Sequence, residues 1–355
     1  MVMILDLRSD TFTKPTPEMR KLMAEAEVGD DVFGEDPTVN LLQETAAQMT
    51  GKEKGLYLAS TTMSNLCGIL GTCWERGAEI FIGDKSHIAL YEQGNVSQMG
   101  GVMVRTVPNN DDGSFDLDYL ETLIHTVDDP HFPRAKAIVV EVTHNMMGGS
   151  VPSLEWLCKV REFANKHKLR VHMDGARAFN ALQHLGIGIK ELCAFADSVS
   201  ICTSKGLGAP VGSLLVSDAA TIKRCHRVRK ALGGGMRQAG IIAAASLYGL
   251  TEMSKRIHED TENAKALANV VSKFDFVEID VKMVHSNIVR FKLKGHSQEE
   301  FIKRCGDDSE GVQVKILIVS GGFIRAVFHN DAKREAVKIG LAKVEKLLSE
   351  MSKKQ

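Results

Sequence analysis

The most reactive group that the sequence offers is the amine of Lys205, in the stretch SKGLGAPVGS. Apolar residues 198–202 predict a short buried strand just before it, and Gly206, Gly208 and Pro210 exclude a helix after it. We therefore expect Lys205 at a strand end, where open α/β sheets carry their chemistry. An amine held there can form a Schiff base with a carbonyl compound, although a lysine that begins a loop is more often a solvated charge.

Three further groups follow expected strands. Thr61 and Thr62 begin a helix, whose free N–H groups and dipole favour a phosphate, or they only cap it. Asp174 could hold a protonated ring nitrogen, and His87 could stack on a flat cofactor, although both residue types are also common in loops. With the amine of Lys205, these groups together indicate pyridoxal 5'-phosphate, for which a protein supplies orientation and electrostatics.

The amino-acid composition indicates which kinds of binding partner to expect. The chain has 355 residues, 44% of them apolar, and a formal net charge of −1, so a nucleic acid or an anionic membrane is not expected and a small molecule is. Seven cysteines without a C-x-x-C pair predict reduced thiols and a cytoplasmic protein. Neither a signal peptide nor an apolar run of membrane-spanning length is expected from the sequence.

Strands and helices alternate over the first 250 residues, which predicts an α/β domain with a mostly parallel sheet and helices on both faces. After residue 250 the pattern changes to a polar helix and short strands, so we expect a smaller α+β domain over 251–355. The expected strands are 55–59, 79–82, 102–104, 137–142, 170–173, 198–202, 212–216, 277–281, 288–292 and 323–328. The expected helices are 17–26, 39–49, one beginning near 61, 154–167, 254–273 and 332–348.

An acidic loop at 28–38 contains Asp30, Asp31, Glu35 and Asp36. These carboxylates have no regular ligand spacing, so we expect no metal site there or elsewhere in the chain.

Nearly the whole chain resembles the low-specificity L-threonine aldolases, which are pyridoxal phosphate enzymes of the aspartate-aminotransferase-like fold (fold type I). The resemblance is carried by LRSDT at 7–11, GDDVFGEDPT at 29–38, DKSHI at 84–88, HFPR at 131–134, THN at 143–145, HMDGAR at 172–177, SKGLGAPVGS at 204–213 and LGGGMRQAG at 232–240. It implies retro-aldol cleavage of L-threonine or L-allo-threonine to glycine and an aldehyde. It also implies a homo-oligomer with dimer-shared sites, expected to be a homotetramer.

The resemblance also assigns roles to the residues of the cofactor site. Lys205 is implied to bind the cofactor covalently, Asp174 to pair with its ring nitrogen and His87 to stack on its ring. Thr61 and Thr62 fall on the phosphate-binding positions. Thr61 replaces a glycine that the family usually has, so the backbone there approaches the phosphate less freely.

Further positions are implied to contact the substrate or a neighbouring chain. Ser9, Arg177 and Arg325 fall on positions that hold the substrate carboxylate, and His131 falls on one near its hydroxyl. Arg237 is implied to lie near the cofactor phosphate or the neighbouring subunit. The stretch around Arg325, IRAVFH, departs from the usual family pattern.

Three other functions are open to the same residues. A nucleotide-binding oxidoreductase is disfavoured, because the chain returns to strand at Gly212 instead of forming the helix that a dinucleotide fingerprint needs. β-Elimination from an amino acid would use the same cofactor residues. A non-enzymatic binding protein would need neither Lys205 nor Asp174. For aldol cleavage the base that takes the β-hydroxyl proton is either His131 or His87.

Overall fold

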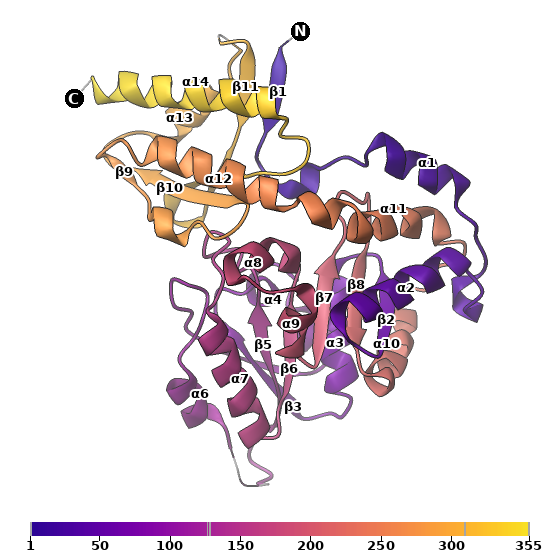
Figure 1. Ribbon diagram of the computed structural model, residues 1–355. Coiled ribbons are helices and arrows are strands. Elements are labelled where there is room, and N and C mark those ends of the chain that lie inside the picture. Colours follow the sequence, from indigo (N-terminus) through magenta and orange to yellow (C-terminus); the bar gives the residue numbers. More distant parts are fainter. Residues whose placement is uncertain (1, 126, 128, 309, 354–355) are drawn as a thin grey trace.

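Seven strands form the central sheet of the computed structural model, which describes residues 2–125, 127, 129–308 and 310–353 (Figure 1). In chain order they are β2 (Lys54–Leu58), β3 (Ala78–Gly83), β4 (Met103–Val107), β5 (Arg134–Glu141), β6 (Arg170–Asp174), β7 (Ser198–Cys202) and β8 (Ser213–Ser217). Their order across the sheet is β2-β8-β7-β6-β5-β3-β4, and β8 alone pairs antiparallel with its neighbours. The mostly parallel sheet is confirmed, and its parallel strands bring their carboxyl ends to one edge.

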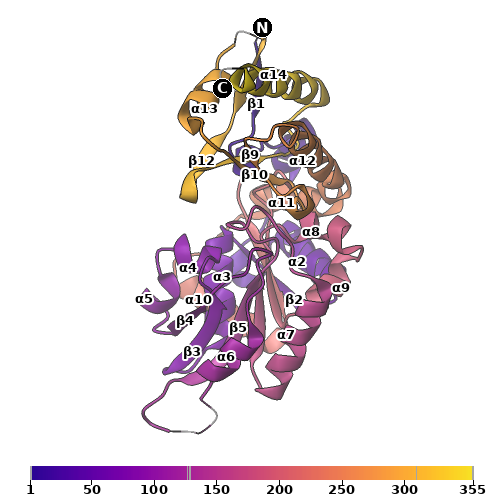
Figure 2. The ribbon, with the colours of Figure 1, turned by 90° about the vertical axis from the view of Figure 1, so that its left-hand side faces the viewer.

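Helices cover both faces of this sheet, which is why β3, β7 and β8 are buried along their whole length. On one face lie α2 (Pro37–Thr50), α7 (Leu154–Lys166), α8 (Ala178–Leu185) and α9 (Ile189–Ala194), and on the other lie α3 (Thr61–Thr72), α4 (His87–Leu90), α5 (Asn95–Gln98) and α10 (Ala219–Ala231) (Figure 2). The core of the first face also includes buried residues of α1 (Pro17–Glu25), α6 (Leu117–Leu123) and α11 (Gly240–Thr251). The helices of this unit that the sequence does not predict are α4, α5, α6, α8, α9, α10 and α11.

A smaller α+β unit lies above the carboxyl edge of the sheet (Figure 1). Its antiparallel sheet has the order β12-β13-β10-β9 and packs on helices that enclose a separate core. The strands are β9 (Val277–Glu278), β10 (Ile288–Leu293), β12 (Leu317–Val319) and β13 (Phe323–Val327), and the helices are α12 (His258–Val271), α13 (Gln298–Cys305) and α14 (Arg334–Ser352). The expected helix 254–273 is divided, because Met253–Arg256 is a separate 3-10 turn.

The N-terminal strand β1 (Met3–Asp6) pairs in parallel with β11 (Val312–Lys315) of the small unit. The sequence places residues 1–250 in one domain with an N-terminal arm, whereas this pairing ties the start of that arm to the second unit. The chain then crosses to the large unit, where α1 packs against α11. No helix of the described ranges combines the length and apolar composition that a membrane crossing needs.

Candidate active site

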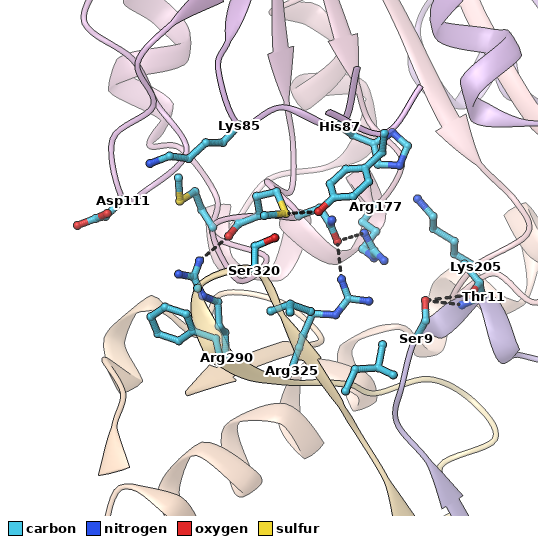
Figure 3. A pocket seen from close by; sticks show the side chains of 18 residues that line it. Ser9, Thr11, Lys85, His87, Asp111, Arg177, Lys205, Arg290, Ser320 and Arg325 are labelled. Carbon is cyan, nitrogen blue, oxygen red and sulfur yellow. Dashed lines mark hydrogen bonds between the residues drawn. The ribbon is translucent and has the colours of Figure 1, made fainter. Parts of the chain in front are cut away.

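A cavity of about 550 Å³ lies between the carboxyl edge of the large sheet and the small unit (Figure 3). Five of the residues predicted from the sequence line it: Ser9, His87, Arg177, Lys205 and Arg325. They come from the N-terminal arm, from three strand ends of the large sheet and from β13 of the small unit. The cavity is therefore complete only when both units and the N-terminal arm are in place.

The backbone that carries Lys205 is held by a tight loop after β7. The N–H of Ala209 donates to the carbonyl of Thr203 (3.0 Å) and the N–H of Gly208 donates to the carbonyl of Lys205 (2.8 Å). Gly208 has a φ of +81°, which favours glycine. The amine of Lys205 extends into the cavity and forms no hydrogen bond with any residue that the structure describes. It is therefore available to a carbonyl group.

Asp174, at the end of β6, is a carboxylate with only 2% of its surface exposed. Its Oδ1 accepts from the N–H of Ala176 (3.0 Å) and its Oδ2 from the side-chain amide of Asn65 (3.0 Å). Among the described residues no lysine or arginine pairs with it. A buried carboxylate that no described lysine or arginine neutralises suits a protonated ring nitrogen, so Asp174 fits the predicted cofactor.

A chain of hydrogen bonds connects Asp174 to His87. The amide of Asn65 donates to both Asp174 and Glu92 (2.9 Å to Glu92 Oε1), and the same Glu92 oxygen lies 2.8 Å from His87 Nδ1. Burial lowers the pKa of His87, but the hydrogen bond with Glu92 and the charges of Asp174 and Glu92 outweigh it, so the pKa is raised. The carboxylates thus favour a protonated imidazole beside the cavity.

His172 fixes the direction in which Asn65 points. Burial lowers the pKa of His172 to about 4, so its ring is neutral near pH 7. Its Nε2 lies 3.2 Å from the carbonyl oxygen of Asn65, which can only accept, and its Nδ1 lies 2.8 Å from the hydroxyl of Ser198. Nε2 therefore carries the proton, and the NH₂ group of Asn65 must face the two carboxylates.

Thr61 and Thr62 begin α3 at the same sheet edge, next to β8. The hydroxyl of Ser60 caps the helix by accepting from the N–H of Met63 (3.2 Å), and the hydroxyl of Thr61 donates to Ser213 (3.3 Å). Neither threonine lines the cavity itself. The first turn of this twelve-residue helix presents N–H groups that suit the phosphate of the cofactor.

Arg177 and Arg325 lie together on the wall of the cavity, and the structure distinguishes them. Arg177 is buried and donates to both carboxylate oxygens of Asp10 (2.7 and 2.8 Å). Arg325 has no carboxylate partner in the described chain; it donates to the carbonyl of Arg8 (3.3 Å), and its buried Nε has no partner. The amide oxygen of Asn145 accepts from both guanidinium groups (3.4 and 3.3 Å). Arg325 is therefore the guanidinium left free for a substrate carboxylate.

Glu141, at the end of β5, holds the backbone of two residues that line the cavity, His87 and Asn145. Its Oε2 accepts from the backbone N–H of His87 (2.6 Å) and its Oε1 from that of Asn145 (2.8 Å). The sequence analysis missed Glu141, as well as Asn65, Glu92 and the partner role of Asp10. Asn145 was missed as well; it and Asp10 stand inside the motifs THN and LRSDT, which marked the stretches without revealing what the side chains contact.

Two predicted site residues do not reach the cavity of their own chain. The side chain of His131 is 82% exposed and lies 2.6 Å from Asp129, on a loop before β5 at the far end of the large unit. The side chain of Arg237 is 56% exposed and pairs with Asp30 (2.9 Å). Within one chain the structure therefore does not bring His131 or Arg237 together with Lys205. Ser9 does line the cavity, where its hydroxyl accepts from the N–H of Thr11 (3.3 Å).

The acidic loop at 28–38 uses its carboxylates to hold the fold. Asp31 pairs with the buried Arg229 (2.8 Å), and Asp30 pairs with Arg237. Asp36 caps α2 and accepts from the N–H of Gly240 (2.8 Å), which ties the loop to α11. These contacts account for three of the four acidic residues that the sequence analysis noted.

The chain resembles known proteins over nearly its whole length. Residues 6–294 match the family model described as β-eliminating lyase. Low-specificity L-threonine aldolase 1 of Arabidopsis thaliana is 41% identical over 335 residues, which is 92% of this chain and 91% of the relative. The low specificity L-threonine aldolase of Escherichia coli K12 is 40% identical over 332 residues, which is 94% of this chain and 96% of the relative.

A solved structure agrees with the fold. Leishmania major threonine aldolase superposes with a TM-score of 0.80 at 16% sequence identity, covering 98% of this chain and 99% of that one. At this identity the superposition supports the arrangement of the elements, not the chemistry. The family model and the sequence relatives are similar enough to assign a family. The chain belongs to the β-eliminating lyase family, as a member of its low-specificity L-threonine aldolase group.

Proposed function

We propose that the protein is a pyridoxal-phosphate-dependent carbon–carbon lyase that cleaves L-threonine and L-allo-threonine to glycine and acetaldehyde. The observation that carries the proposal is the meeting of a free lysine amine, a buried unpaired carboxylate and a raised-pKa histidine at one sheet edge, namely Lys205, Asp174 and His87. The cofactor, when bound, withdraws the electron pair of the bond that breaks at Cα.

The chain's own residues would hold the cofactor at three points. Lys205 would supply the amine that binds its carbonyl carbon. Asp174 keeps the ring nitrogen protonated, because an unpaired buried carboxylate strongly favours a cation beside it. Thr61 and Thr62 bind the phosphate through their hydroxyl and N–H groups at the start of α3.

Arg325 would bind the substrate carboxylate, with Ser9 and Asn145 beside it as neutral hydrogen-bonding groups. Arg177 contributes less to this binding, because its charge is already neutralised by Asp10. A carboxylate fixed by Arg325 would limit rotation of the substrate about Cα and so would help to select the Cα–Cβ bond for cleavage.

Cleavage also requires a base for the β-hydroxyl proton. Of the two histidines that the sequence leaves open, His87 lines the cavity of its own chain. His87 can act as the base only in its neutral form, in which Nδ1–H donates to Glu92 and Nε2 is free to accept the proton, directly or through water. His131 could act only in the cavity of a neighbouring chain.

We also propose a cytoplasmic homo-oligomer, with a homotetramer as the expected form. Phe33, Leu41 and Ile241 are 74%, 53% and 47% exposed; Leu41 and Ile241 lie on α2 and α11, which pack together, and Phe33 ends the 3-10 turn Asp31–Phe33. Large exposed apolar side chains of this kind favour a protein interface. Arg237 lies beside them, which is consistent with a contribution to the partner's site.

The direct experiment measures products. The purified protein with its cofactor is given L-threonine or L-allo-threonine, and glycine and acetaldehyde are quantified. Lys205→Ala should abolish both turnover and the visible absorbance of the lysine-bound cofactor, whereas Lys85→Met, which changes another lysine of the same cavity, should retain both. Pyruvate and ammonia from serine or cysteine, with threonine inert, would establish β-elimination instead.

A further inference from the structure

The cavity extends beyond the groups that a threonine molecule can occupy. On the side away from Lys205 and Ser9 its wall carries Lys85, Asp111 and Arg290, which we call the outer arm (Figure 3). These residues come from the loop after β3, the loop after β4 and strand β10. The side chain of threonine ends in a single methyl group at Cβ, so cleavage of threonine does not require the outer arm.

Of the outer-arm residues, Arg290 is the best placed to bind an anion. Its Nη1 donates to the carbonyl of Met146, and its guanidinium carbon lies 3.8 Å from the centre of the Phe323 ring. Both contacts orient the guanidinium but leave its charge uncompensated. Arg290 forms no ion pair with any described residue, and part of its side chain is withdrawn from solvent. Such a planar, pre-oriented donor suits a carboxylate or phosphate group.

The balance of charge in the outer arm is positive. Lys85 likewise has no ion pair within the described chain, and Asp111, the only acidic residue of the cavity lining, is not hydrogen-bonded to either cation. Burial lowers the pKa of Arg290 from its ordinary value, and the charge of Asp111, which lies near enough to act on it, opposes that shift only in part. Two cations against one anion leave one positive charge for a ligand.

We propose that the outer arm binds an anionic group on the side chain of larger β-hydroxy-α-amino acids, or equivalently on the aldehyde that they release. The inference rests on the proposed aldolase function and names a substrate class for it. Tyr91 lies beside the His87 ring and donates to Met146 Sδ (3.2 Å), whose backbone carbonyl accepts from Arg290, so these two side chains lead from His87 toward the outer arm and can cover an aromatic or aliphatic spacer. Arg290 binds the anion, Lys85 adds to the attraction and Asp111 opposes it.

The reaction with such a substrate balances without a further reactant. In the synthetic direction the Cα of glycine loses a proton and forms a bond with the carbonyl carbon of the aldehyde, whose oxygen takes up a proton. In cleavage the Cα–Cβ bond breaks, the electron pair stays at Cα and is protonated, and the hydroxyl proton leaves. The distant anionic group takes no part in bond making, so its charge affects binding alone.

The test compares aldehydes of the same shape and different charge. With saturating glycine, kcat/KM is measured for 4-carboxybenzaldehyde and for its neutral isostere 4-carbamoylbenzaldehyde. 4-Formylphenyl phosphate tests whether a phosphate is accepted in place of the carboxylate, and succinic semialdehyde against pentanal tests a shorter, flexible spacer. We expect the anionic member of at least one pair to be preferred roughly tenfold, as one charged hydrogen bond would give.

Single substitutions show which residues cause the preference for the anionic aldehyde. Arg290→Met should bring the ratio of anionic to neutral kcat/KM close to one, Arg290→Lys should keep part of it, and Lys85→Met should reduce it. Asp111→Asn should raise the ratio. Because each ratio is taken within one variant, a change that only disturbs the loop at Met146 lowers both rates and leaves the ratio unchanged.

The outcomes separate this inference from the function on which it rests. Wild-type protein that cleaves threonine but shows no charge preference in any pair, or whose preference persists in Arg290→Met, would overturn the outer arm alone. Protein that cleaves no β-hydroxy amino acid would overturn the proposed function first.

Discussion

Asp10 and Arg177 form a fully buried, two-point ion pair, with Oδ2 2.7 Å from Nε and Oδ1 2.8 Å from Nη2. The pair joins the N-terminal arm to the segment after β6, so it fixes the position of Ser9 relative to the large sheet. It also removes the charge of Arg177 from the cavity. The resemblance assigns both Arg177 and Arg325 to the substrate carboxylate. In the structure Arg177 holds the N-terminal arm, and Arg325 is the one that remains able to bind a ligand.

Asp10→Asn should destabilise the protein by about 3 kcal/mol, because it leaves the guanidinium of Arg177 buried without an anion. Burial raises the pKa of Asp10, but the charge and hydrogen bonds of Arg177 outweigh it and hold the pKa well below its usual value. The stabilisation from Asp10 is therefore complete above about pH 4 and is lost as the pH falls toward the lower folded value. Urea unfolding of both proteins at pH 7 and at successively lower pH measures the difference, and equal stability at pH 7 would contradict this role.

Arg325→Ala should lower kcat/KM for L-threonine by roughly 30-fold to 700-fold, the equivalent of about 2 to 4 kcal/mol for a lost charged contact. Arg325→Lys should recover only part of the loss, since an ammonium cannot bind a carboxylate at two points. Steady-state kinetics on the three proteins checks the prediction. Unchanged kcat/KM in Arg325→Ala would move the carboxylate site to another residue, with Arg177 the first to examine.

Glu92→Gln should lower the pKa of His87, because the carboxylate that favours its protonated form is replaced by a neutral amide. The pKa of His87 in the folded protein is raised above 6.5, so its contribution to stability is full below that value and is lost as the pH rises through the folded pKa. NMR titration of the imidazole protons in both proteins measures the shift. His172→Gln serves as a control for general disturbance of Asn65, and an identical His87 titration in wild type and Glu92→Gln would refute the link.

Asp174→Ala should bind the cofactor at least roughly tenfold more weakly, since it removes the only acidic partner proposed for the ring nitrogen. Asp174→Asn keeps the hydrogen bond to Asn65 but not the charge, so it should bind the cofactor better than it turns over substrate. Equilibrium dialysis of the cofactor and kcat for threonine separate the two effects. Near wild-type kcat in Asp174→Asn would show that the carboxylate is only structural.

Much of the site was predictable because it depends on local sequence at strand ends. Lys205, Asp174 and His87 each follow a buried apolar strand, and parallel strands must bring such positions to one edge. Residues whose partners lie far away in the chain could not be found in this way. Nothing in the local pattern connects Asp10 to Arg177, or Asn65 to His172, because those contacts form only when the sheet and the arm are assembled.

The same holds for the fold: elements with a clear pattern in their own sequence were predicted, and elements that depend on distant segments were not. Buried strands β6 and β7 have clear apolar patterns, whereas β1 and β11 are short and pair with each other from distant parts of the chain; β12 has only three residues. Helices α10 and α11 were missed for different reasons. The first has an even mixture of charged and apolar residues, and the second is almost uniformly apolar, so it shows little contrast between its faces.

The pairing of β1 with β11 has a consequence for the order of folding. Met3 is made well before its partner Val312, because most of the described chain separates the two residues. The large sheet can form as soon as β8 has emerged, while the arm that carries Ser9 and Asp10 cannot complete its pairing until β11 has been made. The amine and carboxylate of the cofactor site are therefore in place first, and the wall that receives the substrate is assembled last.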